Sequence, residues 1–217
     1  MSELFDEVDE EVRRDQLKKL WDKYSIYIIA LAVLVVAGVG GWRGHEYLEA
    51  KKAAEAGASF ERAVELSEQN KHAEAEAAFA DLVAKAPAGY RTLARLRLAA
   101  EIANRDPQAA AKMYDEIAVD RSVGPPEQDL ARVRAGQLLL EKSSYQDMLQ
   151  RLEPATSANS TFRHTARELL ALSAWRVNDA TAARKWLDLI ASDAETPPSL
   201  RSRAEALQAL LPPVAKS

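Results

Sequence analysis

One uncharged stretch, residues 24–42, dominates the hydrophobic pattern of the chain, with the sequence YSIYIIALAVLVVAGVGGW. A helix of this length measures about 28 Å, close to the roughly 30 Å thickness of the hydrocarbon layer of a bilayer. Aromatic side chains, which favour the headgroup region of a membrane, flank both ends: Trp21, Tyr24, Tyr27, Trp42 and Tyr47. The stretch therefore predicts a transmembrane helix.

A cleaved signal peptide and a buried core helix are the two alternatives to a membrane anchor. A signal peptide has a short basic region followed by about 7–15 apolar residues, whereas residues 1–23 here carry eight acidic and five basic side chains. No other segment is apolar enough to enclose a core helix. We therefore expect an uncleaved anchor in which small residues four positions apart let a second helix pack closely: Ala37 with Gly41, and Gly40 with Gly44.

Lysine and arginine are more frequent before the stretch than after it. Five precede it and three follow within about 15 residues, which favours a cytoplasmic N-terminus: Arg13, Arg14, Lys18, Lys19 and Lys23, then Arg43, Lys51 and Lys52. We expect a single-pass protein with a charged helical tail, residues 1–23, in the cytoplasm and residues 43–217 on the other side of the bilayer. The absence of cysteine fits an oxidising compartment.

Beyond the stretch, the chain repeats a helical pattern with a period near 35 residues. Short polar breaks, about 34, 38 and 36 residues apart, divide it: Asn70-Lys71, Asn104–Asp106, Lys142–Ser144 and Asn178-Asp179. After three of the breaks a small residue precedes two bulky ones: Ala75 before Phe79 and Leu82, Ala110 before Tyr114 and Ile117, and Ala183 before Leu187 and Ile190. The third unit departs from this pattern, with Met148 and then Leu152.

This pattern is typical of stacked helical pairs. A small residue lets two helices cross closely, and the bulky residues after it fill the groove against the next pair. A single pair cannot bury its apolar face, so pairs stack and end in a capping element. We therefore expect an all-α protein, in which a single N-terminal transmembrane helix precedes an α-solenoid of about four helical hairpins, capped by a helix over residues 199–211. An ordinary helical bundle is the alternative, although it would not share one period.

Composition and motifs argue against several classes of function. Residues 43–217 carry 24 basic and 25 acidic side chains, so they lack the basic face that nucleic acids require. The chain has no glycine-rich phosphate loop, nucleophile elbow or His-Glu-x-x-His motif. His164 and Glu168, four residues apart, are expected to be a surface or loosely packed pair rather than a catalytic one. We predict a protein that is not an enzyme, with no cofactor, no metal and no small-molecule substrate.

The second helix of each unit resembles tetratricopeptide repeats. The first-helix signature of that family is missing, with Ala63 and Ala171 where the family has glycine and Leu98 in the second unit. The resemblance implies a repeat domain that binds other proteins. The residues that match are Ala75, Phe79, Leu82 and Pro87, then Ala110, Tyr114 and Ile117, then Ala183, Leu187 and Ile190.

Over nearly its whole length, the chain resembles the YfgM-like family, the ancillary subunit of the bacterial SecYEG translocon. The likeness lies in a charged tail (DEVDEEVRRDQLKKLWDKY), one membrane helix ending in Gly-Trp-Arg, and a repeat domain. It implies a protein of the bacterial inner membrane with a periplasmic repeat domain. Its implied partners are translocon subunits, a membrane-anchored periplasmic chaperone and emerging client proteins. The same layout also suits an envelope-assembly or cell-division scaffold, or a stress-signalling regulator that acts through the cytoplasmic tail.

The inner face of the repeat array is the candidate partner-binding surface. Apolar side chains of the first helix in each pair are expected to face it, where they would anchor segments of partner proteins: Phe60, Val64, Val133, Leu140, Leu172 and Trp175. The alternative is that most of them are core residues between helices. Arg95 and Arg176 alone would not form a polar clamp for acidic termini.

Overall fold

The structure, a computed structural model, describes the backbone of residues 3–212 and the side chains of Arg14, Lys18 and residues 21–212. Every regular element in that range is helical, which confirms the predicted all-α fold there. The chain divides into two compact units, Met1–Ala54 and Glu55–Ser217. We call the second one the repeat unit. The domain boundary predicted at residue 43 refers to the membrane surface and stays a prediction.

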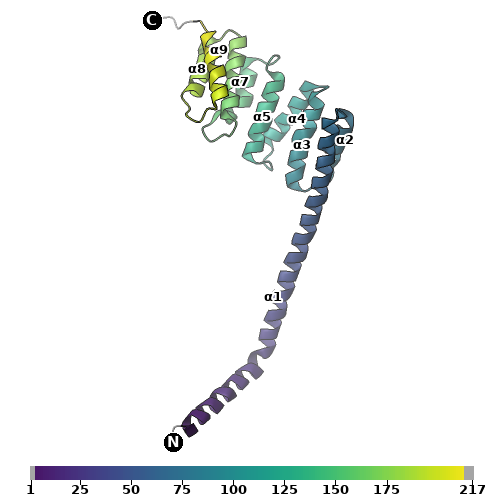
Figure 1. Cartoon of the computed structure of the whole chain (residues 1–217), viewed down its shortest axis with the longest axis vertical. Helices are drawn as coiled ribbons and strands as arrows, with labels where there is room; N and C mark the ends of the chain where they lie inside the picture. Colours follow the sequence, from purple (N-terminus) through teal and green to yellow (C-terminus); the bar gives the residue numbers. More distant parts are fainter. Residues whose placement is uncertain (1–2, 213–217) are drawn as a thin grey trace. The chain divides into compact units, whose positions relative to one another are not determined.

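Nine α-helices and one short 3-10 helix follow one another in the described range, joined by short turns and loops (Figure 1). They are α1 (Glu3–Glu68), α2 (His72–Lys85), α3 (Ala88–Ala103), α4 (Pro107–Val119), α5 (Pro125–Leu139), α6 (Tyr145–Leu152), η1 (Glu153–Thr156), α7 (Arg163–Arg176), α8 (Ala180–Ala191) and α9 (Pro198–Ala209).

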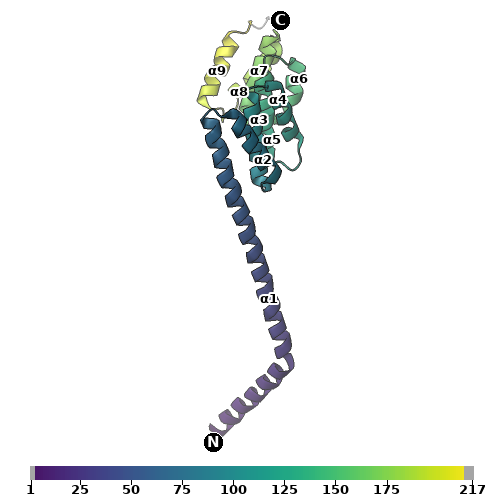
Figure 2. The same ribbon diagram turned by 90° about the vertical axis from the view of Figure 1, so that its right-hand side faces the viewer.

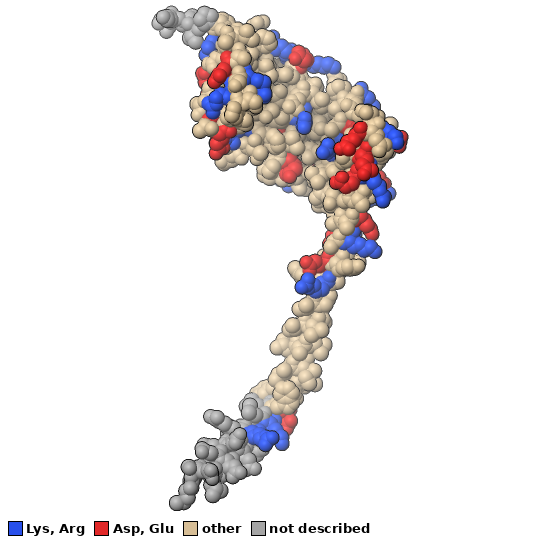
Figure 3. Space-filling model, in the orientation of Figure 1, with Lys and Arg blue, Asp and Glu red and all other residues tan. Residues whose placement is uncertain are grey.

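Within the described residues, α1 is the one helix long and apolar enough, by length and composition, to cross a membrane. Its segment Trp21–Glu68 contains an 18-residue window with a mean hydropathy of 2.2, none of it buried. Figure 3 shows this stretch as a band free of charged side chains, with charges on either side. A Cβ added at Gly40, Gly41 or Gly44 meets no atom within 4 Å. The surface on which a second helix is predicted to pack is therefore open.

In the repeat unit, consecutive helices form four pairs followed by a single helix. The end of α1 packs on α2, and the other pairs are α3 with α4, α5 with α6, and α7 with α8. Each helix contacts mainly its neighbours in sequence, so the pairs stack in chain order (Figure 1). In the turned view of Figure 2, the helices from α2 to α8 overlap one another. At the end of the stack, α9 packs on α8, which confirms the capping helix predicted over residues 199–211 to within two residues at each end.

All four predicted breaks are turns between the two helices of a pair, and the first and fourth share one geometry. Asn70 and Asn178 both have a φ of 60°, a left-handed conformation that asparagine tolerates better than most residues. In both turns the N–H of the following residue donates to the carbonyl five positions back, at 2.9 Å. This bond satisfies a carbonyl that the end of the helix would otherwise leave unpaired.

Three of the breaks also supply the N-cap of the helix that follows. The carboxylate of Asp106 accepts hydrogen bonds from two backbone N–H groups at the start of α4, at 3.1 and 2.9 Å. The hydroxyl of Ser144 caps α6 at 3.1 Å, and the carboxylate of Asp179 caps α8 at 2.9 Å. The polar breaks thus both end one helix and begin the next, which is why they recur with the repeat.

Small residues lie where the helices pack most closely. Several alanines of the first, second and fourth pairs have no exposed surface, among them Ala63, Ala75, Ala110, Ala171 and Ala183. The bulky residues that follow them in the second helices are equally buried, among them Phe79, Ile117, Leu187 and Ile190. Together they form three apolar clusters along the stack.

The third pair reaches the same packing with the small residue on the other helix. Met148 and Leu152 of α6 are fully buried. Opposite them, α5 presents Gly136, where an added Cβ would lie 3.0 Å from Leu152 Cδ2. The glycine therefore makes room for the leucine, and the departure seen in the sequence is compensated across the pair.

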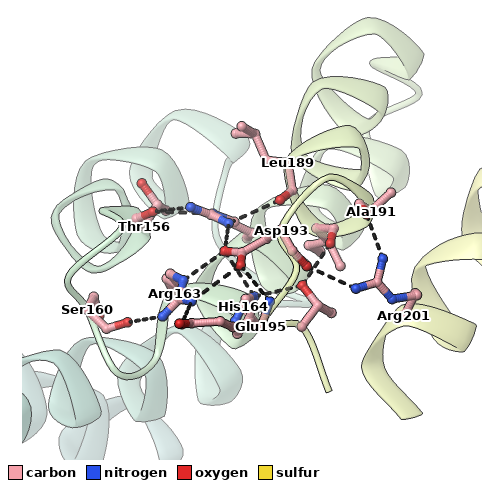
Figure 4. Close-up of polar contacts among 12 residues, drawn as sticks. Thr156, Ser160, Arg163, His164, Leu189, Ala191, Asp193, Glu195 and Arg201 are labelled. Atoms are coloured by element: carbon pink, nitrogen blue, oxygen red, sulfur yellow. Dashed lines mark hydrogen bonds and ion pairs between the residues drawn. The ribbon is translucent and has the colours of Figure 1, made fainter. Parts of the chain in front are cut away.

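Polar side chains tie α7 and α9 to the loop between α8 and α9 (Figure 4). The carboxylate of Asp193 in that loop accepts hydrogen bonds from Arg163 Nε at 2.8 Å and Arg167 Nη1 at 3.0 Å. Arg201 of α9 donates to the backbone carbonyls of Ala191 and Asp193, at 2.6 and 2.9 Å. We call Arg163, Arg167, Asp193 and Arg201 the C-terminal clasp, since they hold the end of the stack together.

The packing analysis makes a first prediction about Ala110. Replacing it with leucine is expected to overpack the second pair and lower the free energy of unfolding by about 1–3 kcal/mol. The exposed side chain of Gln108 offers a control on the same helix, where Gln108→Ala should stay within about 0.5 kcal/mol. Denaturant unfolding of the full chain in detergent measures both. Equal stabilities would contradict a close-packed role for Ala110.

A second prediction concerns acidification of the clasp. Hydrogen bonds from Arg163 hold the pKa of Asp193 far below its ordinary value. The stability that this provides is complete above the unfolded pKa, about 4, and is lost as pH falls through the folded value. Burial lowers the pKa of the nearby His164, so this side chain binds a proton more readily in the unfolded chain than in the folded protein. The free energy of unfolding is therefore expected to begin to fall below about pH 6.5.

The measurement is the melting temperature of the full chain as a function of pH, followed by circular dichroism. Asp193→Asn should melt lower than the parent protein at neutral pH and respond less to acid below about pH 4. Glu116→Gln, at an exposed position of α4, removes a carboxylate outside the clasp and should follow the parent. Parallel curves for the parent protein and Asp193→Asn would refute the prediction.

Candidate protein-binding groove

A cavity of about 580 Å³ opens among α1, α3, α4 and α5 in the first three pairs. Its walls come mostly from first helices, because the second helices are used for packing between pairs. The apolar side chains that line it are Phe60, Leu93, Leu96, Ala100, Ala103, Leu130 and Leu138.

One face of α3, which carries both large and small residues, forms the floor of this cavity. Gly89, Leu93, Leu96, Ala100 and Ala103 follow at intervals of three or four residues, which places them on one side of a helix. Three of these residues are glycine or alanine, which leaves room above the helix. Leu93 is 46% exposed, so it is an apolar side chain without a full complement of neighbours.

A second cavity, of about 510 Å³, continues along the same helix. It is lined by residues 88–90, Thr92 and Leu93 of α3 and by Ser122, Gly124 and Glu127 before and within α5. Both cavities include Leu93, so they meet there. We call the two together the α3 groove. An added Cβ at Gly89 meets nothing within 4 Å, so the groove is open at this end too.

The charged residues along the α3 groove are unevenly placed. Arg97 and Arg134 line the larger cavity, and no carboxylate is among its lining residues. Glu127 lines the smaller cavity. Arg134 Nη1 donates to Gln137 Oε1 at 3.3 Å. The larger cavity therefore combines an apolar floor with two exposed guanidinium groups.

Tyr114 anchors the floor from below. Its hydroxyl donates to the carbonyl of Leu96 at 3.2 Å, and the residue is buried. Burial raises the pKa of this hydroxyl, while the positive charges of Arg134 and Arg97 act in the opposite direction. The phenol thus stays a neutral hydrogen-bond donor that fixes the backbone of α3 beneath the groove.

The six residues predicted to bind partners do not lie together. Phe60 lines the α3 groove, where its ring packs edge-on against Phe79 with the centroids 5.5 Å apart. Val64 is half-buried against the same apolar cluster as Phe60. Leu140 and Leu172 are half-buried, and Trp175 is 43% exposed near the end of α7. Partner binding by these five residues stays a prediction.

Val133 is a correction to that set. Its side chain is only 3% exposed and belongs to the cluster that includes Met148 and Leu152. The expectation that it faces an open surface is therefore wrong. An apolar pattern on a first helix does not tell which residues face the neighbouring pair, because that depends on the angle at which the pairs cross.

Sequence reasoning missed the residues that make the groove distinctive: Leu93, Arg97, Leu130 and Arg134. The hydrophobic pattern marks bulky apolar side chains and does not mark the small residues of α3. The available signal was the regular spacing, three or four residues apart, of the stripe that contains Gly89, Ala100 and Ala103.

The two arginines considered from the sequence are both engaged within the chain. Arg95 pairs with Asp120 at 2.6 Å. Hydrogen bonds from Ser122 and Arg95 lower the pKa of that carboxyl to about 2. Arg176 donates to the backbone carbonyls of Glu141 and Ser143. Neither lines the α3 groove.

His164 and Glu168 have separate partners rather than each other. His164 Nδ1 lies 3.1 Å from Thr196 Oγ1, and Glu168 accepts a hydrogen bond from Arg203 Nε at 2.7 Å. Within the described part of the chain, no group of three or more His, Cys, Asp or Glu side chains is placed to hold a metal ion.

Comparison with known proteins identifies the family. A family model described as a tetratricopeptide repeat-like domain matches residues 18–185, more than half of the chain. The chain belongs to this family. The tetratricopeptide repeat-like match includes the apolar stretch of α1 and runs into α8. No curated protein and no solved structure matches the chain. Helical repeats of this kind stack into surfaces that bind other proteins.

Proposed function

We propose that the protein is a non-enzymatic, membrane-anchored adaptor that binds segments of other proteins in the α3 groove. The observation that carries the proposal is the groove itself, an apolar surface on a repeat scaffold with an exposed leucine at its centre. Grooves of this kind bind partner segments through apolar anchors. The family supports protein partners in general.

The anchor is the second part of the proposal. The uncharged window of α1 has no cover from the rest of the described chain. So large an apolar surface is unfavourable in water, and a bilayer would bury it. The excess of lysine and arginine before the window supports a cytoplasmic N-terminus, which would place the repeat unit in the bacterial periplasm.

The third part is the identity of the partners. The resemblance to the YfgM-like family supports translocon subunits, a membrane-anchored periplasmic chaperone and emerging client proteins as the proteins that the adaptor brings together. An envelope-assembly or division scaffold, and a regulator acting through the cytoplasmic tail, would use the same architecture. Experiments on topology and on the groove separate these possibilities.

Anchoring makes a third testable prediction. The protein should stay at full length in the membrane fraction, and the repeat unit should resist protease in intact cells. Opening the outer membrane should make the repeat unit accessible, while a tag at the N-terminus stays protected. A soluble form of roughly 175 residues as the main species would show cleavage and overturn the anchor. Digestion of the N-terminal tag before the repeat unit would reverse the orientation.

Partner binding makes a fourth testable prediction. A photoreactive benzoylphenylalanine at Leu93 should form adducts in cells with translocon subunits or with a periplasmic chaperone. Leu189 of α8, also exposed but outside the α3 groove, is the matched control and should form few. Adding Ala100→Leu should reduce the adducts from Leu93, because the larger side chain fills the groove.

Three results would count against this assignment. Adducts with cell-wall or division enzymes would favour the scaffold. Equal adducts from Leu93 and Leu189 would show that the α3 groove is not the docking site. Recruitment of a soluble regulator by residues 1–23 alone would favour signalling through the tail.

A further inference from the structure

The larger cavity of the α3 groove is lined by two arginines, Arg97 and Arg134, and by no acidic residue. Several arginines elsewhere in the repeat unit are bound to carboxylates of a neighbouring helix or loop, such as Arg95 to Asp120 at 2.6 Å, Arg105 to Glu76 at 2.8 Å and Arg151 to Asp115 at 2.8 Å. Arg97 and Arg134 are exposed, and among the described residues no ion pair joins either of them to an acid. Their charge is therefore available to a ligand.

We propose that the α3 groove selects segments of partner proteins that carry carboxylates beside apolar residues, with the carboxylates at Arg97 and Arg134. This inference rests on the proposed docking function and specifies the chemistry of its ligand. A guanidinium group offers five N–H donors in a planar fork that matches a carboxylate. Bonds between two ionised partners are stronger than neutral ones, and a low-dielectric apolar floor strengthens them further.

The apolar part of the ligand is set by the floor. Leu93, Leu96 and Leu130 form a surface that a purely acidic segment would not cover. The small residues along α3 let a backbone approach closely. From Gly89 to Ala103 the stripe is about 21 Å long, which matches roughly 14 residues of helix or six to seven residues of extended chain.

The position of Glu127 makes the two ends of the groove differ in charge, so that it favours one orientation of an acidic ligand. It lines the smaller cavity, whereas Arg97 and Arg134 line the larger one. An acidic residue of the ligand is attracted to the two arginines and repelled by Glu127, since like charges oppose binding. The ligand is therefore expected to lie with its acidic end in the larger cavity, and with neutral or basic residues beside Glu127.

Selection from a random peptide library tests this directly. The full-length protein, held in lipid nanodiscs, is panned against displayed peptides of about 15 residues, which suffice to span the stripe in either conformation. Peptides that also bind the Ala100→Leu protein are removed, which leaves ligands of the groove. Asp and Glu should be enriched over Lys and Arg among these, together with leucine and other apolar residues.

Binding of a selected peptide is then measured by fluorescence anisotropy. Arg97→Gln and Arg134→Gln should each weaken it by about tenfold or more, as expected for a lost charge-assisted bond. Arg62→Gln is the matched control, because Arg62 is exposed on α1 and does not line the groove. Added salt should weaken the parent complex and have less effect on the double variant.

Two outcomes would overturn the inference in distinguishable ways. Groove-dependent peptides without acidic enrichment, or with unchanged affinity for Arg97→Gln and Arg134→Gln, would refute the charge selection and leave the docking function standing. Failure to recover any peptide that depends on Ala100 would refute both. Circular dichroism of each variant confirms that it is folded, so that a loss of binding reports on the groove.

Discussion

Close contact between helices is the constraint on which the repeat unit depends. A pair of helices about 35 residues long cannot bury its own apolar face, and it is stable only when the next pair covers it. In this protein alanines bring the helices together, and Ala63, Ala75 and Ala171 have no exposed surface at all. Because the second helices are occupied by packing, the first helices are left to form a surface. The α3 groove is a consequence of that division.

How much of this could be predicted depends on how local each feature is. The turns at Asn70 and Asn178 and the cap at Asp106 were predictable, because a few neighbouring residues determine them. The exposed and buried faces of the helices were harder to predict. Val133 is buried in a cluster that other helices complete, and Gly136 makes room for a leucine on another helix. Arg97 and Arg134 were missed since only the folded stack shows which charges lack a partner.

Charged side chains have two distinct roles in the stack. Arg105 with Glu76 and Arg151 with Asp115 each join one pair to the next, and Arg203 with Glu168 joins α9 to the fourth pair. Contacts of this kind are exposed to solvent to different degrees and add modest stability, but they fix the register between pairs. The arginines of the groove have no such task. A nearly neutral domain can therefore still present a local positive site.

The chain order of the contacts has a consequence for how the protein is made. Helices contact mainly their neighbours in sequence, and the side-chain bonds that join them span about one repeat: Arg105 to Glu76, Arg151 to Asp115 and Arg203 to Glu168. No early segment has to wait for a distant one, so each pair can pack on its predecessor as soon as it emerges. A domain of this kind suits vectorial folding, from the N-terminal pair outward, while the chain is still being delivered.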